Sequence, residues 1–313
     1  MLRCVLRDVK GKEFSLPELL SLQVNIDEGV PADSLYATFV NTPTEQLVGI
    51  TLYDDDTPLF IGIVDEEERQ RDQKGEFLKI SARSLAAHLL DNEAAPCAYD
   101  HPSLGLIYER YAKPYGIELY ESGAAVFFGE QSVTKGSSCW RVLKNFCTAC
   151  YSAVPRVSSV GVLYPKGIQN DGEIAFGSEG IRYTAIREVQ KRCEEISTVY
   201  VKASNADTYS LPIVNPQAAE RGVRRVRYLN AMLTESPMRC ADAMIRNGEK
   251  KAYEVHLSCS SCMLGKEGYR AVLKDEALGD RNDLYISAVH YRMTKDGETS
   301  NITLKRRQDD VDQ

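Results

Sequence analysis

The chain has 313 residues, enough for two or three domains of ordinary size. Its 38 Lys and Arg against 45 Asp and Glu give a net charge of −7, so the global charge does not favour docking on nucleic acid or on an anionic membrane. No apolar run is long enough to cross a membrane, and the start has no signal-peptide pattern, so the nine cysteines indicate reduced thiols rather than a disulfide framework.

The first 95 residues have the pattern of a β-meander. An Asp-rich turn at 54–58 and a charged turn at 72–75 separate three extended runs. The middle run, from Leu59 to about Arg71, is apolar on both faces at its start and polar further on, which predicts a strand that begins in a core and ends in water or at a partner. The stretch ISARSLAAHLLDNEA, residues 80–94, predicts a strand that passes directly into a short helix.

Helical periodicity begins after residue 100. In HPSLGLIYERYAKPYG, Ser103 is a suitable N-cap, and Pro114 with Gly116 ends the pattern. In SSCWRVLKNFCTACY the apolar positions again share one helical face. The two predicted faces consist of Leu104, Ile107, Tyr108 and Tyr111, and of Trp140, Leu143, Cys147 and Cys150. A small helical domain is therefore expected over residues 96–170.

Strand patterns return from residue 171 and are interrupted by one helix near 236–248. Ser236 is the expected N-cap of this helix, and Asn247 with Gly248 is its expected end. Residues 171–313 are therefore expected to form a second β domain.

The two longest predicted hairpins resemble each other. Residues 59–83 and 284–307 share an apolar start, a polar extension, a charged turn with glycine and a returning strand that ends in basic residues. This likeness indicates two similar β domains on either side of the helical one.

Two CxxC pairs could supply four thiolates to a structural zinc ion: Cys147 with Cys150, and Cys259 with Cys262. The pairs are much further apart than in a zinc ribbon, and the first lies on an apolar helical face, where free cysteine acts as a small hydrophobe. A thioredoxin-type role needs the pair at a helix start, whereas CTAC comes late in its helix. Buried thiols are the favoured interpretation, and metal binding by these four cysteines is left open.

The remaining polar residues form no recognisable catalytic signature. A dyad of Cys139 or Cys262 with a histidine lacks the local pattern of thiol proteases. The acidic run at 54–56 suits a tight turn, and the run at 65–68 alternates between strand faces, so its four acids cannot converge on one ion. No phosphate loop or dinucleotide fingerprint is present. The four histidines, which show no metal-binding spacing, are His88, His101, His256 and His290.

Two short basic clusters are interpreted as solvated strand edges or subunit contacts. They are Arg224, Arg225 and Arg227, and Lys305, Arg306 and Arg307.

The order of five segments resembles the baseplate hub proteins of contractile phage tails and of defective prophage particles in Gram-positive bacteria. In that family an Arg-Ser pair, here Arg83 and Ser84, followed by an Ala/Leu helix and LLDNEA, marks the exit from the first β-barrel into the helical domain. The chain departs from the family in its many cysteines and in Ala82, where glycine is frequent. The five segments are VPADSLYATF (30–39), PLFIGIVDEEERQRDQKGEFLKISARSLAAHLLDNEA (58–94), EEISTVYV (194–201), RRVRYLNA (224–231) and LYISAVHYRMTKDGETSNITLKRR (284–307).

The resemblance implies an α+β, mainly β fold with two tube-protein-like β-barrels and an intervening helical domain. The domains would be 1–95, 96–170 and 171–313. It also implies a homotrimer that matches the sixfold tail tube to the threefold spike and lines the central channel. Its partners would be the tail tube protein, the tail spike protein and other baseplate proteins.

We therefore expect a structural protein of a virion or tail-like particle, assembled in the host cytoplasm, with no catalytic residue, metal or cofactor. The expected contacts include neither a membrane nor a specific nucleic-acid sequence, although DNA or cargo could pass through an acidic channel. Two alternatives are a hub or spike adaptor of a non-phage contractile injection system and a tail-associated peptidoglycan hydrolase.

Overall fold

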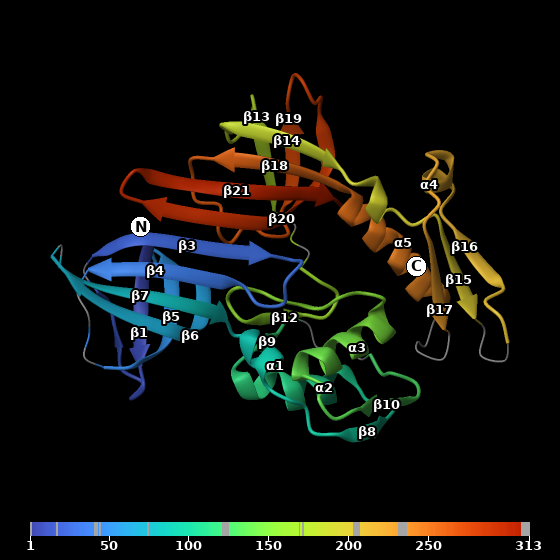
Figure 1. Cartoon of the computed structure of the whole chain (residues 1–313), viewed down its shortest axis with the longest axis horizontal. Helices are drawn as coiled ribbons and strands as arrows, with labels where there is room; N and C mark the ends of the chain where they lie inside the picture. The colour runs from blue at the N-terminus through green and yellow to red at the C-terminus, as the bar shows by residue number, and fades with distance from the viewer. Residues whose placement is uncertain are drawn as a thin grey trace.

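A computed structural model describes residues 2–16, 18–40, 43, 45–73, 75–120, 125–168, 170, 172–202, 207–230 and 237–307. The protein is mainly β, as expected, and contains four units (Figure 1). Two β units lie side by side, a helical unit packs beside the first of them, and a smaller unit projects from the second. No helix in the described part of the chain combines the length and hydrophobicity needed to span a bilayer.

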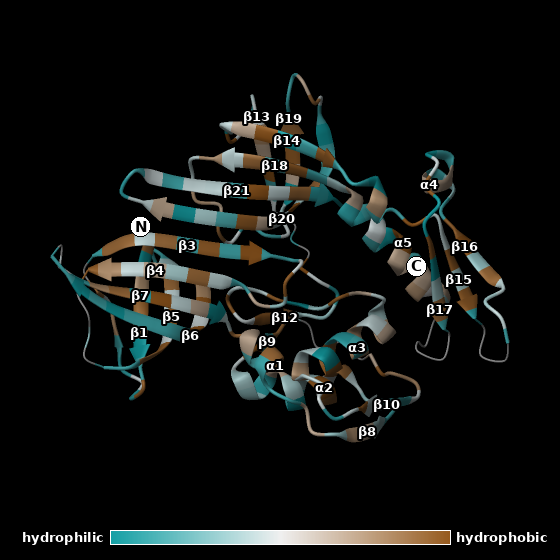
Figure 2. Ribbon diagram, viewed as in Figure 1, coloured by the Kyte–Doolittle hydropathy of each residue, from teal (hydrophilic) through white to brown (hydrophobic). Residues whose placement is uncertain are grey.

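The first β unit contains the predicted meander, β5 to β7, and these strands end within two residues of the predicted turns. Leu59 and Phe60 are buried at the start of β6, and its outer half is hydrophilic and exposed, as predicted (Figure 2). Its strands are β1 (Leu2–Asp8), β2 (Glu13–Phe14), β3 (Leu19–Asp27), β4 (Ser34–Val40), β5 (Leu47–Asp54), β6 (Thr57–Asp72) and β7 (Gly75–Ser84).

The helical unit has its own hydrophobic core between α1, α2 and α3. The Ser103 hydroxyl caps α2 by accepting a hydrogen bond from the Leu106 amide, and Trp140, Leu143 and Cys147 are buried on one face of α3, as the periodicity predicts. The elements are α1 (Ala87–Asp91), β8 (Cys97–Asp100), α2 (Leu104–Tyr111), the 3₁₀ turn η1 (Lys113–Tyr115), β9 (Glu118–Leu119), β10 (Glu130–Val133), α3 (Cys139–Tyr151), β11 (Arg156–Val157) and β12 (Val162–Tyr164).

The second β unit includes the predicted closing hairpin, β20 with β21. Its strands are β13 (Glu173–Gly177), β14 (Ala185–Gln190), β18 (Tyr253–Cys259), β19 (Arg270–Lys274), β20 (Arg281–Thr294) and β21 (Gly297–Arg306).

Residues 191–252, here called the insert, form a separate unit between β14 and β18. A three-stranded sheet, ordered β16-β15-β17, packs on α5 through a small core. The elements are η2 (Arg192–Glu194), β15 (Thr198–Lys202), β16 (Leu211–Val214), α4 (Pro216–Glu220), β17 (Val226–Asn230) and α5 (Pro237–Ala252).

The predicted end of the last helix at Asn247 and Gly248 is wrong. The helix continues to Ala252, and Gly248 lies inside it at a close approach to the Glu194 segment. A Cβ atom at residue 248 would lie 2.7 Å from the Glu194 carbonyl oxygen, so this glycine provides space for packing rather than a stop. The predicted cap, Ser236, lies outside the described residues.

The two β units share one sheet and one hydrophobic cluster. β3 pairs with β20 in antiparallel register, with Gln23 opposite Arg292 and Asn25 opposite His290. The main strand order is β14-β18-β21-β20-β3-β4-β7-β6-β5-β1-β2, with β19 and β13 branching from β20. Among the described residues no pairing closes this sheet into a barrel, because β3 and β20 use their edges to join the two units. The two expected barrels are therefore not confirmed.

Candidate functional site

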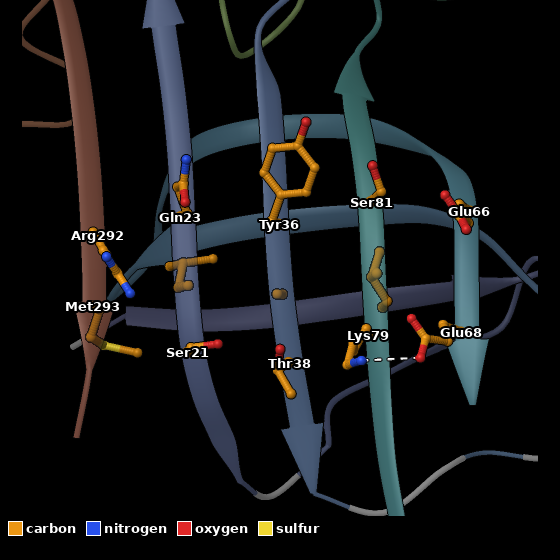
Figure 3. A pocket seen from close by; sticks show the side chains of 13 residues that line it. Ser21, Gln23, Tyr36, Thr38, Glu66, Glu68, Lys79, Ser81, Arg292 and Met293 are labelled. Atoms are coloured by element: carbon orange, nitrogen blue, oxygen red, sulfur yellow. Dashed lines mark hydrogen bonds and ion pairs between the residues drawn. The ribbon is translucent and has the colours of Figure 1, made fainter. Parts of the chain in front are cut away.

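A polar face runs across eight adjacent strands, from β14 to β6, and crosses the junction between the two β units. Side chains alternate along each strand, so one face packs on the shared core and the other is open. Strand register aligns one row across five strands, from β20 to β6 (Figure 3). The row consists of Arg292, Gln23, Tyr36, Ser81 and Glu66.

This row lies in an open groove of about 360 Å³. Tyr36, 48% exposed, stands near its centre. Lys79 and Glu68 form an ion pair of 3.0 Å along one side. Hydroxyl, amide and charged groups therefore line the groove, together with the Tyr36 ring and Met293.

A second hollow, of about 530 Å³, lies on the same face over β14, β18, β21 and β20. It includes His256, whose ring lies 3.4 Å from the Glu254 carboxylate. Burial, together with the positive charge of Arg187, lowers the pKa of His256, although Glu254 opposes this shift. The polar face therefore continues from the first β unit into the second.

Both signs of charge occur on the polar face. The net charge of −7 is therefore not concentrated there. The acidic residues include Asp27, Glu66, Glu68, Asp72 and Glu254, and the basic residues include Lys79, Arg83, Arg187, Arg292 and Lys305.

The eight strands end in two open edges. β5 pairs with β6 from Thr57 to Ile63, and in the described structure residues 65–72 of β6 pair only with β7. At the other end, β14 pairs only with β18 within the same described ranges. Such edges present unpaired backbone groups to another chain.

Arg83 and Ser84 form the corner where β7 leads into the helical unit. The Arg83 guanidinium pairs with Asp65 at 2.6 Å and with Asp91 at 2.7 Å. Hydrogen bonding to Arg83 lowers the pKa of Asp91. The Ser84 hydroxyl accepts a hydrogen bond from the Asp33 amide, and the Ser84 amide donates one to the Asp33 carbonyl. The Arg-Ser pair thus fixes the direction of the chain at this corner.

A buried charged cluster joins three of the four units. Arg156, from β11, donates hydrogen bonds to the Asp33 carboxylate and to the Val30 carbonyl oxygen at 2.6 Å. The side chain of Asp33 is fully buried. Glu267, from the loop after β18, is half-buried as a whole residue, but its Oε2 is shielded from solvent. Among the described residues neither this oxygen nor Asp33 Oδ2 has a hydrogen-bond partner.

Two carboxylates and one guanidinium in this cluster favour a bound proton. Burial raises the pKa of Asp33 to about 6, although Arg156 opposes the shift. Burial also raises the pKa of Glu267. The stability of the contact between these three units should therefore depend on pH.

The structure separates the two CxxC pairs. Cys147 and Cys150 belong to the core of the helical unit, and Cys259 and Cys262 belong to the core shared by the β units. Burial raises the pKa values of Cys147, Cys259 and Cys262, which keeps these thiols protonated. No cluster of three or more His, Cys, Asp or Glu suited to a metal occurs in the described ranges.

The histidines are dispersed. His88 stacks on Tyr115 with ring centroids 5.1 Å apart, and His101 lies 2.6 Å from the Asp100 carboxylate. His290 is exposed on β20. No hydrogen bond or ion pair in the described structure joins Cys139 or Cys262 to a histidine.

The acidic runs take the places predicted for them. Asp54 and Thr57 bracket the turn between β5 and β6, and the acids of β6 pair separately, Asp65 with Arg83 and Glu68 with Lys79. The two basic clusters lie on different kinds of strand. Arg227 lies on β17, an edge strand of the insert sheet. Lys305 and Arg306 lie on β21, an inner strand between β18 and β20, so the prediction of a strand edge is wrong there. Arg225 pairs with Glu194 at 3.6 Å, Lys305 with Glu28 at 3.0 Å and Arg306 with Asp283 at 3.7 Å.

The polar face was not predicted from the sequence. The alternation of Ser21, Gln23 and Asn25 with buried residues was a readable signal for one polar strand face. The row across β3 and β20 depends on pairing between segments more than 250 residues apart, which local patterns do not specify.

No protein-family model matches the sequence, and no curated protein sequence matches it. Solved structures do match over nearly the whole chain. A tail protein from Neisseria meningitidis is 15% identical, with a TM-score of 0.75, over 97% of this chain and 96% of that one. The chain has the fold of phage tail proteins.

Two further structures extend this likeness. A 43 kDa prophage tail protein from Shewanella oneidensis is 13% identical, with a TM-score of 0.76, over 98% of this chain and 97% of that one. An Escherichia coli component of the type VI secretion system, described as similar to phage T4 tail proteins, is 8% identical, with a TM-score of 0.57, over 93% of this chain and 74% of that one. The resemblance to phage tail proteins is thus confirmed at the level of the fold.

Proposed function

We propose that this chain is the structural hub of a baseplate in a contractile phage tail or tail-like particle. The observation that carries the proposal is the polar face of eight adjacent strands, four from each β unit, with open edges at both ends. The likeness to tail proteins supports it.

The strand order suits a symmetry adaptor. The first β unit contributes β6, β7, β4 and β3 to the face, and the second contributes β20, β21, β18 and β14, so each copy has two groups of four strands. Three copies would present six such groups to a sixfold tube and threefold symmetry to a spike.

The open edges provide a way to join the copies. β14 of one copy would extend the sheet at residues 65–72 of the next, and the expected barrel would then close only in the trimer. Arg187 of β14 and Glu66 of β6 both lie on the polar face, so this arrangement brings opposite charges together. Hydrogen bonding along both strands would satisfy their free backbone groups.

The polar face would line the channel. Gln23, Tyr36, Thr38 and Ser81 make this lining rich in amide and hydroxyl groups, with charges of both signs around them. Mixed charge replaces the expectation of an acidic lining, and it would let DNA or cargo pass without strong electrostatic binding.

Tube, spike and other baseplate proteins would be the partners, the particle would be the location, and the role would be non-enzymatic. The type VI component favours a second candidate, a hub of a non-phage injection system. We place this candidate second because the type VI component has a lower TM-score than the tail protein and a smaller share of its chain is matched.

A charge exchange tests the proposed edge pairing. We expect Arg187→Glu or Glu66→Arg alone to weaken trimer assembly by about tenfold, because like charges then face each other across three interfaces. The double variant should recover most of the wild-type association, measured by analytical ultracentrifugation over a dilution series. Additive losses in the double variant would contradict the pairing.

A further inference from the structure

The small sheet of the insert has one covered face and one open face. Val199 and Val201 of β15 are buried against Ala241 and Ile245 of α5. Because side chains alternate along a strand, Tyr200 and Lys202 point to the opposite side, here called the outer face.

Aromatic side chains gather on the outer face. Register places Tyr200 beside Pro212 on β16 and Tyr228 on β17. The rings of Tyr200 and Tyr228 stack with centroids 5.7 Å apart, and Tyr209 meets Tyr228 edge-on at 5.4 Å. Tyr228 is 65% exposed and Val214 is 52% exposed, so the cluster is not part of a core.

Such a cluster is typical of a protein interface. Tyrosines bury large areas at little conformational cost, and contiguous exposed aromatic groups on a soluble protein indicate a partner. Each of these rings already has one side against another ring, and the chain's net charge of −7 disfavours a nucleic-acid backbone. A protein surface is therefore the favoured partner.

Charge indicates which protein surface fits. The insert, residues 191–252, contains eleven Lys and Arg against seven Asp and Glu, a net charge of +4 in a chain whose total is −7. The rest of the same chain therefore carries −11. A second copy offers an acidic surface that complements the basic insert.

Position points to the same partner. The insert leaves the second β unit directly after Gln190, the last residue of β14. Lys191 pairs with Glu254 at 2.5 Å, which anchors the start of the insert to β18. A copy that docks on the β14 edge would lie beside the insert.

We propose that the outer face docks on the acidic body of the neighbouring copy, as a contact separate from the paired strand edges. This inference rests on the proposed trimer. The basic cluster at Arg224, Arg225 and Arg227 would then belong to the unit that forms this subunit interface.

Photo-cross-linking tests the contact directly. Tyr228 is replaced by p-benzoylphenylalanine in the full chain. The purified protein is irradiated at the same concentration at which its oligomeric mass in solution is measured. We expect a covalent species of two or more chains, with the cross-linked peptide of the second chain rich in Asp and Glu. A trimeric mass with no cross-link between chains overturns this inference and leaves the hub proposal standing, whereas a monomeric mass, both for the chain alone and after co-expression with the tube and spike proteins, overturns both.

A pair of variants measures the strength of the contact. Tyr228→Ser should weaken association by about tenfold or more, as expected for an aromatic group at the centre of an interface. Tyr120→Ser is the matched control, since Tyr120 is 58% exposed and stacks on Tyr164 in the helical unit. Equal weakening by both variants, or none by Tyr228→Ser, overturns the inference.

Discussion

Replacing Glu267 by glutamine tests the buried charged cluster at the junction of three units. Glutamine has the shape of the protonated glutamic acid side chain but cannot ionise. The folded protein should therefore tolerate it well at low pH and benefit from it at high pH, where wild-type Glu267 must become charged while buried.

The magnitude follows from the pKa shifts. The pKa of Asp33 is raised from 3.8 to about 6. A shift of that size makes ionisation of Asp33 cost about 3 kcal/mol of folding free energy as pH rises through 4 to 7. The sign is a loss of stability with rising pH, because the raised pKa means that the folded state holds the proton more tightly than the unfolded state. The pKa of Glu267 shifts in the same direction.

We expect Glu267→Gln to change the free energy of unfolding little at pH 4 and to raise it by about 1–3 kcal/mol at pH 8, where the charge of a carboxylate with one shielded, unsatisfied oxygen is removed. Removing this negative charge should also lower the pKa of Asp33, since Glu267 contributes to raising it. The assay is urea unfolding at pH 4, 6 and 8, with exposed Glu130→Gln as the control. An equal destabilisation at every pH would refute the reasoning.

Three other predictions concern the corner, the long helix and the cysteines. Arg83→Gln should lower the free energy of unfolding by about 1 kcal/mol, a value reduced for solvent screening, and speed proteolysis near residue 85, because Asp65 and Asp91 lose their shared partner. Gly248→Ala should lower the melting temperature, since the added Cβ meets the Glu194 carbonyl oxygen and outweighs a gain of about 1 kcal/mol in helix propensity; a higher melting temperature would contradict this packing. Treatment with EDTA should leave the melting temperature unchanged, because the two CxxC pairs lie in separate cores; a fall reversed by zinc would show a metal site.

Local sequence patterns predicted the elements whose stabilising contacts are local. The faces of α2 and α3, the Ser103 cap and the limits of β6 and β7 all follow from periodicity and turn residues. The end of α5 was predicted wrongly because Gly248 is a typical stop signal, whereas here tertiary packing against Glu194 determines the residue.

Pairing between distant segments was not predictable from local patterns. The insert sheet depends on parallel pairing of Thr198 with Val226, with α4 in the crossover, and nothing in either strand specifies the other. The buried cluster is similar, since Asp33 and Arg156 are 123 residues apart and neither stands in a recognisable motif. The polar face is continuous across both β units only because of the register of β3 against β20, which neither strand specifies locally.

The most direct test of the hub proposal is the solution mass of the purified chain, measured by light scattering after size exclusion. The proposal predicts a mass near three times the 35.0 kDa subunit, either for the chain alone or after co-expression with the tube and spike proteins. A strict monomer under both conditions, at high protein concentration, would contradict it.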